Sequence, residues 1–211
     1  MNYEEALKIF SDSYLDRYSV EFPTIFSIVN FDSKTVLEIG SAEGYFVKEA
    51  SRIAKSVRTS DSFYSLPFDD NFFDIVLSRW VIQNVEDVEK LVREMCRVAK
   101  ENVIIILPSD GGDETRILSI KFHDKFRMRK ERIEKIKKLL SESGFKVKEE
   151  KNLLNFRFKD VNTAVEVFYN LGFKGSLADD EIDRLKKFLS ERQKENGVHI
   201  TQGASYICGY K

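Results

Sequence analysis

Short apolar runs alternate with segments of helical periodicity along the first half of the chain. Four runs have the length and the apolar or β-branched composition of strands, at residues 35–40, 57–60, 72–78 and 103–107. Between them, residues 45–55 and 86–100 place apolar side chains three and four positions apart, as amphipathic helices do. Because strands that alternate with helices form βαβ units, this half predicts a parallel sheet with helices on both faces.

The same periodicities extend to both ends of the chain. Residues 3–29 carry aromatic and aliphatic side chains at helical spacing, and Pro23 suits the start of a second short helix. A helix is predicted at 129–143, closed by Gly144, and residues 145–149 alternate like a strand. Asp160 and Asp179 are expected to cap two more helices, which end near Gly172 and Gly197. Residues 110–113 are expected to form a loop, and residues 204–210 are expected to form the last strand.

Composition narrows the class of protein. The 211 residues are 42% hydrophobic, which is enough for the core of one domain, and 34 Lys and Arg against 35 Asp and Glu argue against a globally basic nucleic-acid binder. Cys96, Cys208, His123 and His199 are scattered without ligand spacing, so no metal site is expected. With no signal peptide, no apolar run of about 20 residues and few cysteines, the sequence predicts a cytoplasmic protein.

The segment from Glu38 to Gly44 is the most informative for function. Small residues at 40, 42 and 44 would let a ligand lie against the backbone at the carboxyl end of a strand. The segment lacks the GxGxxG spacing of a dinucleotide site, contains no Lys or Arg, and places Glu43 near the helix start, where a phosphate would meet an uncompensated carboxylate. A cationic ligand without phosphate fits better, and S-adenosylmethionine (SAM) is such a ligand.

Two sequence blocks carry a family resemblance. VLEIGSAEGYF at 36–46 and LPFDDNFFDIVL at 66–77 resemble, in order and spacing, the motifs of class I SAM-dependent methyltransferases of the small-molecule type. The resemblance covers about residues 34–108. It implies a three-layer α-β-α, doubly wound, Rossmann-like fold, an N-terminal helical lid at 1–33, a core at 34–150, a helical cap insertion at 151–203 and a last strand at 204–211, all in a single methyltransferase domain.

The resemblance also implies which residues bind the cofactor. The turn of Gly40, Ser41, Ala42 and Gly44 would cradle the methionine part of SAM, with Glu38 acting through water or backbone. Ala42 departs from the commoner glycine. Asp61, 21 residues beyond Gly40, would bind the ribose hydroxyls, with Ser62 beside it; the alternative is a loop aspartate that caps a turn.

A second departure concerns the sheet edge. The family fits a helix and a third strand where this chain has only four residues between Asp61 and Leu66, so one edge of the sheet must be trimmed. Phe63 or Tyr64 would either stack on the adenine or pack into the core.

Candidate residues for the methyl acceptor follow the strand at 72–78. Arg79 could bind an anionic substrate or be a surface residue of an ion pair, and Trp80 could wall the site or fill the core. The motif of nitrogen-methylating members is absent, and Asn84 stands where small-molecule members often carry His, so no catalytic residue is assigned. Tyr14 and Tyr18 could contact substrate from the lid, or pack between helices.

These features predict methyl transfer from SAM to an unidentified small molecule. One alternative is an RNA methyltransferase that uses the basic segment 121–138, which carries nine bases against three acids. A structural interpretation of the same segment, without a role in RNA binding, is a solvated helix face. The other alternative is a SAM-binding protein without catalytic activity.

Overall fold

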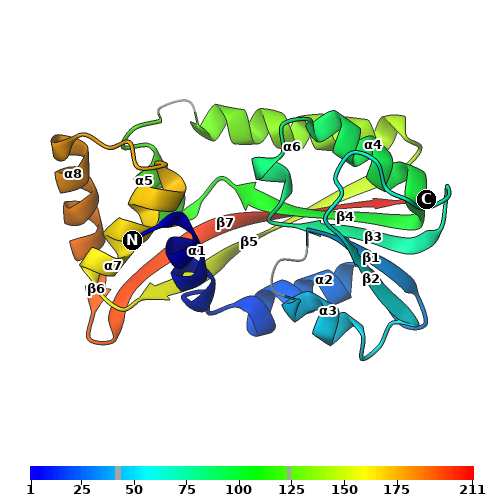
Figure 1. Cartoon of the computed structure of the whole chain (residues 1–211), viewed down its shortest axis with the longest axis horizontal. Coiled ribbons are helices and arrows are strands. Elements are labelled where there is room, and N and C mark those ends of the chain that lie inside the picture. The colour runs from blue at the N-terminus through cyan, green and yellow to red at the C-terminus, as the bar shows by residue number, and fades with distance from the viewer. Residues whose placement is uncertain (41–43, 123–124) are drawn as a thin grey trace. The chain divides into compact units, whose positions relative to one another are not determined.

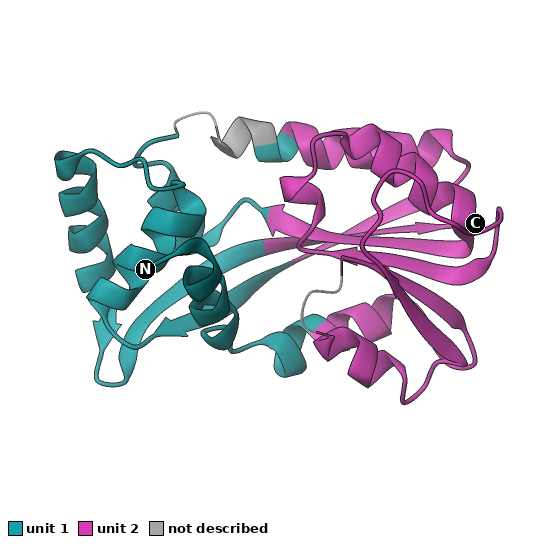
Figure 2. Cartoon of the chain, in the orientation of Figure 1, with its two compact units in different colours: residues 1–21, 109–130, 152–203 teal, residues 22–108, 131–151, 204–211 magenta. Residues whose placement is uncertain are grey.

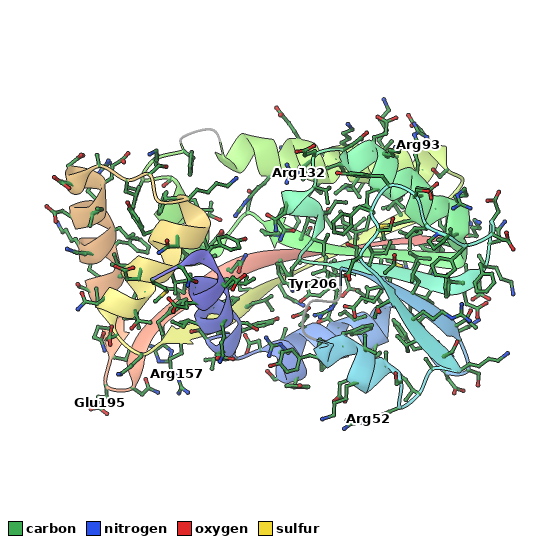
Figure 3. The ribbon with its side chains drawn as sticks, in the orientation of Figure 1. Arg52, Arg93, Arg132, Arg157, Glu195 and Tyr206 are labelled. Carbon is green, nitrogen blue, oxygen red and sulfur yellow. The ribbon has the colours of Figure 1, made fainter. Side chains whose placement is uncertain are left out.

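The computed structural model describes residues 1–40, 44–122 and 125–211, with the backbone alone at 125–128. The chain divides into two compact units (Figure 2). Unit 1 comprises residues 1–21, 109–130 and 152–203, and unit 2 comprises residues 22–108, 131–151 and 204–211. Figure 3 shows the side chains that the ribbon carries. None of the described helices is long and apolar enough to cross a membrane.

One sheet runs through the chain in the order β2-β1-β3-β4-β7-β5, and β6 pairs with β7 (Figure 1). The strands are β1 (Thr35–Ile39), β2 (Ser56–Ser60), β3 (Phe73–Arg79), β4 (Ala99–Ser109), β5 (Lys146–Phe158), β6 (Gln193–Lys194) and β7 (Gly197–Tyr210). β1 is parallel to β2 and β3, and β3 is parallel to β4. The predicted parallel, doubly wound part of the sheet is therefore confirmed.

The predicted trimming of the sheet is also confirmed. β2 stands at the end of the strand order, and the described residues 61–72 form no strand before β3 pairs with the other side of β1. The family strand that this chain omits is thus the one that would follow β2.

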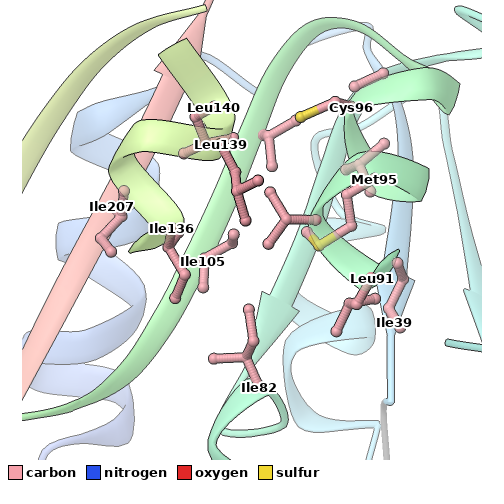
Figure 4. Close-up of a cluster of buried hydrophobic side chains, with 14 of the residues drawn as sticks. Ile39, Ile82, Leu91, Met95, Cys96, Ile105, Ile136, Leu139, Leu140 and Ile207 are labelled. Atoms are coloured by element: carbon pink, nitrogen blue, oxygen red, sulfur yellow. The ribbon is translucent and has the colours of Figure 1, made fainter. Parts of the chain in front are cut away.

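Unit 2 has three layers. Helices α4 (Val88–Val98) and α6 (Lys125–Glu142) cover one face of the sheet, and α2 (Phe22–Ile28) and α3 (Tyr45–Ala50) cover the other (Figure 1). Residues from α4, α6 and four strands form one buried apolar cluster (Figure 4). On the opposite face, Phe46 stacks on Phe26 and meets Phe22 and Phe31 edge-on. Burial on both faces explains why β1, β3 and the second half of β4 are almost continuously apolar.

Unit 1 contains residues 152–158 of β5 and residues 197–203 of β7. Its helices are α1 (Tyr3–Asp12), α5 (Gly112–Leu118), α7 (Val161–Val167) and α8 (Asp179–Ser190), with π-helical turns at Arg17–Glu21 and Phe168–Gly172. A capping box between Asn2 and Glu5 begins α1, and the predicted cap Asp160 accepts a hydrogen bond from the Thr163 backbone at 2.8 Å. Phe10 stacks on Phe156 in its core.

Several predicted bounds are wrong. β5 continues to Phe158 instead of ending at 149, and β7 begins at Gly197 instead of 204. Buried residues 154, 156 and 158 alternate with exposed neighbours, so this is a half-buried strand at the start of the segment taken for a helical cap. The helix predicted at 45–55 ends at Ala50, α5 occupies part of the expected loop, and Asp179 lies in the first turn of α8 while Ala178 is its N-cap.

Candidate cofactor site

The glycine turn follows β1 in unit 2. The Gly40 backbone N–H donates to the Ser60 carbonyl at 2.9 Å, which extends the pairing of β1 with β2 by one residue. Gly40 has φ +75°, and a Cβ there would lie 2.5 Å from a methyl carbon of Val81. Both the backbone angle and the packing therefore require glycine. Ser41 and Ala42, with Glu43, lie outside the described residues.

Gly44 closes the turn as the N-cap of α3. Its φ is +65°, again in the left-handed region. In contrast to Gly40, a Cβ on Gly44 would have no described atom within 4 Å other than those of its chain neighbours. Gly44 is thus required by its backbone angle, while the space beside it is open.

Glu38 is buried at the end of β1 and is paired with Arg79. The Arg79 Nε–H donates to Glu38 Oε1 at 2.9 Å, and the two side chains are 13% and 2% exposed. Among the residues that the structure describes, Glu38 Oε2 has no hydrogen-bond partner. A buried carboxylate oxygen without a donor is costly, so Oε2 is an acceptor available to a ligand.

Asp61 and Ser62 directly follow β2. Since Ile39 and Ser60 are paired in the parallel register of β1 and β2, Asp61 and the glycine turn lie at the same edge of the sheet. Both Asp61 and Ser62 are exposed. The Ser62 hydroxyl donates to the Ser65 carbonyl at 2.7 Å, which closes the short connection. Asp61 therefore has the predicted position, and its binding role stays a prediction.

Phe63 and Tyr64 pack against the core of unit 2. The Tyr64 hydroxyl accepts hydrogen bonds from the backbone N–H groups of Glu86 and Asp87, at 3.1 and 3.2 Å. Of the two roles open to these rings, the structure favours core packing.

Ser78, Arg79 and Trp80 form the end of β3 and the residue after it. Trp80 has φ +57°, a backbone conformation that is uncommon for a bulky residue and is concentrated at functional sites. Its N–H donates to the Ile106 carbonyl at 2.9 Å, and its own carbonyl accepts from Gln83 Nε2 at 2.6 Å. The backbone of Trp80 is thus held on both sides, and its indole is half-buried.

Tyr14 and Tyr18 belong to unit 1. The Tyr14 ring stacks on Phe156 with centroids 4.9 Å apart, and the Arg17 guanidinium lies 5.4 Å from the same ring. Tyr18 is exposed. The Tyr14 ring thus packs on strand β5, and the substrate-binding role of both tyrosines stays a prediction.

Much of the basic segment 121–138 is used within the chain. At least four of the bases whose side chains the structure describes form ion pairs: Arg129 with Glu114, Lys135 with Glu89, Lys137 with Glu134 and Glu149, and Lys138 with Glu142. Arg132, labelled in Figure 3, donates to the Gln83 carbonyl at 2.8 Å. His123 lies outside the described residues. These pairings favour the interpretation of the segment as a helix face whose cations pair with carboxylates of the same chain, and they disfavour a surface of unpaired cations that binds phosphates.

The described side chains fit the ligand that the sequence suggests. Glu38 and Asp61 provide carboxylate oxygens at the carboxyl ends of two adjacent parallel strands, and residues 38–40 and 44 contain no base. Arg79 is the nearby cation, and it is paired with Glu38. Carboxylates suit the ammonium and ribose hydroxyls of SAM and disfavour a pyrophosphate. Sequence reasoning missed the Glu38–Arg79 pair, because only the register of β1 with β3 brings these residues together.

Part of the chain is similar to known methyltransferases. Residues 42–107 match the family model described as a methyltransferase domain. Demethylmenaquinone methyltransferase of Shouchella clausii is 34% identical over 71 residues, which cover 31% of this chain and 30% of the relative. The chain thus aligns with less than a third of that curated relative.

Solved structures share the fold over nearly the whole chain. A proposed methyltransferase of Bacillus halodurans superposes with a TM-score of 0.60 at 14% identity, covering 92% of this chain and 99% of that one. The YcgJ protein of Bacillus subtilis gives a TM-score of 0.57 at 18% identity, covering 90% and 97% of the two chains. Together with the two sequence blocks, these similarities show that the chain has a Rossmann-like methyltransferase fold and that residues 42–107 are similar to a methyltransferase domain.

Proposed function

We propose that this chain transfers the methyl group of SAM to a small-molecule acceptor. The observation that carries the proposal is the pair of carboxylates at adjacent strand ends, Glu38 in the last residues of β1 and Asp61 directly after β2, beside a glycine turn without bases. A phosphate-free, cationic nucleoside matches this donor set, whereas a dinucleotide would need a phosphate-binding turn.

In this proposal, SAM supplies a methyl group that is activated by the positive charge on its sulfur. Glu38 Oε2 accepts a hydrogen bond from the ammonium group, and Asp61 accepts from the ribose hydroxyls. Gly40, Gly44 and the intervening Ser41 and Ala42 bring backbone against the methionine part, with Ser62 next to the ribose. Holding the donor in one orientation supplies much of the rate in such a reaction, since no bond to the protein is formed.

Trp80 is the acceptor-side residue that the described geometry supports best. It directly follows β3, next to β1 in the sheet, and its left-handed backbone is fixed by hydrogen bonds on both sides. An indole carried on a fixed backbone can exclude water and orient an acceptor. Tyr14 and Tyr18 remain proposed substrate contacts of the N-terminal segment. No side chain is assigned as a general base.

A small molecule is favoured over RNA as the acceptor. Four bases of the segment 121–138 are ion-paired within the chain, so the segment offers phosphates less charge than its composition suggests.

The buried, unpaired cysteines are consistent with a reducing compartment such as the cytoplasm.

Calorimetric titration tests the cofactor assignment. S-adenosylhomocysteine (SAH), the demethylated product, should bind with a dissociation constant in the micromolar range, whereas NAD should not bind at the same concentrations. Equal affinity for NAD, or no heat with SAH, would overturn the proposal. Release of SAH from SAM in the presence of candidate acceptors then separates an enzyme from a SAM-binding protein without activity.

A further inference from the structure

The Arg79 guanidinium is held between a carboxylate and two aromatic rings in unit 2. Its Nε–H donates to Glu38 Oε1 at 2.9 Å. Its central carbon lies 5.2 Å from the centre of the Phe22 ring and 5.3 Å from the centre of the Phe46 ring. A planar guanidinium gains from stacking on aromatic rings as well as from pairing with a carboxylate. β3, α2 and α3 thus all contribute to the position of Arg79.

This arrangement acts on Glu38 in two ways. The positive charge compensates a carboxylate that is almost fully buried, which would otherwise be costly to keep ionised. The hydrogen bond uses Oε1 and so restricts rotation of the carboxylate. Oε2, which finds no donor within the described part of the chain, therefore keeps one orientation.

The role first expected for Arg79, binding an anionic substrate, competes with this pairing. An anion would have to attract a buried guanidinium that is already bonded to Glu38. Removal of one partner from a buried ion pair leaves the other charge uncompensated, which is strongly unfavourable. The local geometry therefore favours a role for Arg79 that acts through Glu38.

We propose that Arg79 is a positioning residue, which holds the Glu38 carboxylate so that Oε2 accepts a hydrogen bond from the ammonium group at the amino-acid end of the cofactor. The inference rests on the proposed function. In this arrangement the Glu38–Arg79 pair contributes to specificity. It recognises the amino-acid end of the ligand, whereas Asp61 would bind the adenosine end. An ammonium is the matching donor because it is compact and carries three N–H groups.

The test compares two ligands that differ at this end. SAH carries both the adenosine and the amino acid, whereas 5′-methylthioadenosine keeps the adenosine and the thioether and lacks the amino acid. Arg79→Met, which retains apolar bulk beside the rings, should raise the dissociation constant of SAH about tenfold or more, the equivalent of one hydrogen bond to a charged group. The dissociation constant of 5′-methylthioadenosine should change by less than about twofold.

Two further variants keep the inference falsifiable. Glu38→Gln should show the same selective loss for SAH. Arg79→Lys should recover only part of the affinity, because lysine keeps the charge but lacks the planar group and the Nε–H. Melting curves without ligand report the stability of each variant.

The outcomes separate this inference from the proposed function. Equal loss of both ligands in a folded Arg79→Met variant would show a merely structural role and overturn the inference, as would unchanged SAH binding. If Arg79→Met does not fold, Glu38→Gln decides by the same comparison. Failure of the unaltered protein to bind SAH would instead count against the proposed function itself.

Discussion

A Cβ placed on Gly40 would lie 2.5 Å from Cγ2 of Val81. Gly40 directly follows β1, and Val81 lies two residues beyond the end of β3. The Val81 side chain therefore fills the space that a side chain on Gly40 would need between these neighbouring strand ends. The glycine is needed for packing before any ligand is considered, and its φ of +75° adds a second, independent requirement.

The first prediction follows from that contact. Gly40→Ala should lower the free energy of unfolding by about 2 kcal/mol or more, because overpacking costs about 1–3 kcal/mol and the left-handed backbone about 1–2 kcal/mol for alanine. Urea unfolding without ligand measures the loss. Adding Val81→Ala should recover part of it, since the smaller side chain removes the overlap. Strictly additive losses in the double variant would show that Val81 does not cause the strain.

The second prediction concerns Asp74, which clamps the start of β3 to β1. Its Oδ2 accepts from the backbone N–H and the hydroxyl of Thr35, both at 2.8 Å. Burial acts to raise the pKa of Asp74, but these hydrogen bonds and the charge of Lys100 outweigh it and lower the pKa. Asp74→Asn should therefore cost about 1–3 kcal/mol at pH 7.

The pH dependence has a definite sign. A carboxyl group whose pKa is lowered by folding stabilises the protein above its unfolded pKa, about 3.9, and loses that contribution as the pH falls through the folded pKa. The difference in stability between Asp74→Asn and the unaltered protein should thus shrink below about pH 4. Melting curves from pH 7 to pH 3 test this, with the exposed Asp69→Asn as control. A difference that stays constant with pH would contradict the clamp.

The third prediction concerns the two cysteines. Cys96 and Cys208 are buried, and burial raises the pKa of both thiols, that of Cys208 to about 11. The thiolate is the reactive form of cysteine. The rise in the pKa of Cys208 lowers its thiolate population about a hundredfold, and burial restricts access of the reagent as well. At pH 8 a thiol reagent should modify the folded protein far more slowly than the protein in guanidinium chloride. Rapid modification of the folded protein would show that one of these cysteines is accessible.

The parts of this molecule that sequence analysis predicted depend on local patterns. The glycine turn, the aspartate after β2 and the trimmed sheet edge follow from short motifs and from the four residues between Asp61 and Leu66. The alternation of β5 is visible in the sequence, but the family resemblance implies a helical cap from residue 151 and so predicts too short a strand. The Glu38–Arg79 pair and the Gly40–Val81 contact depend on tertiary packing, which single-sequence patterns do not contain.

The last prediction tests the adenosine end of the site. Asp61 is exposed directly after β2, and its side chain has no hydrogen bond or ion pair to the described residues around it. Asp61→Ala should therefore leave the melting temperature without ligand unchanged. It should weaken the binding of SAH by about 1–3 kcal/mol, because the ribose hydroxyls lose a charged acceptor.

Asp61→Asn and the nearby Asp69→Ala complete the experiment. Asparagine keeps one acceptor oxygen without the charge, so its effect on the dissociation constant should be intermediate, and the control at the exposed Asp69 should have none. Binding of 5′-methylthioadenosine should weaken as much as binding of SAH in Asp61→Ala, since both ligands carry the ribose. An unchanged dissociation constant would make Asp61 a turn residue, whereas a lowered melting temperature without ligand would show that its carboxylate stabilises the connection after β2.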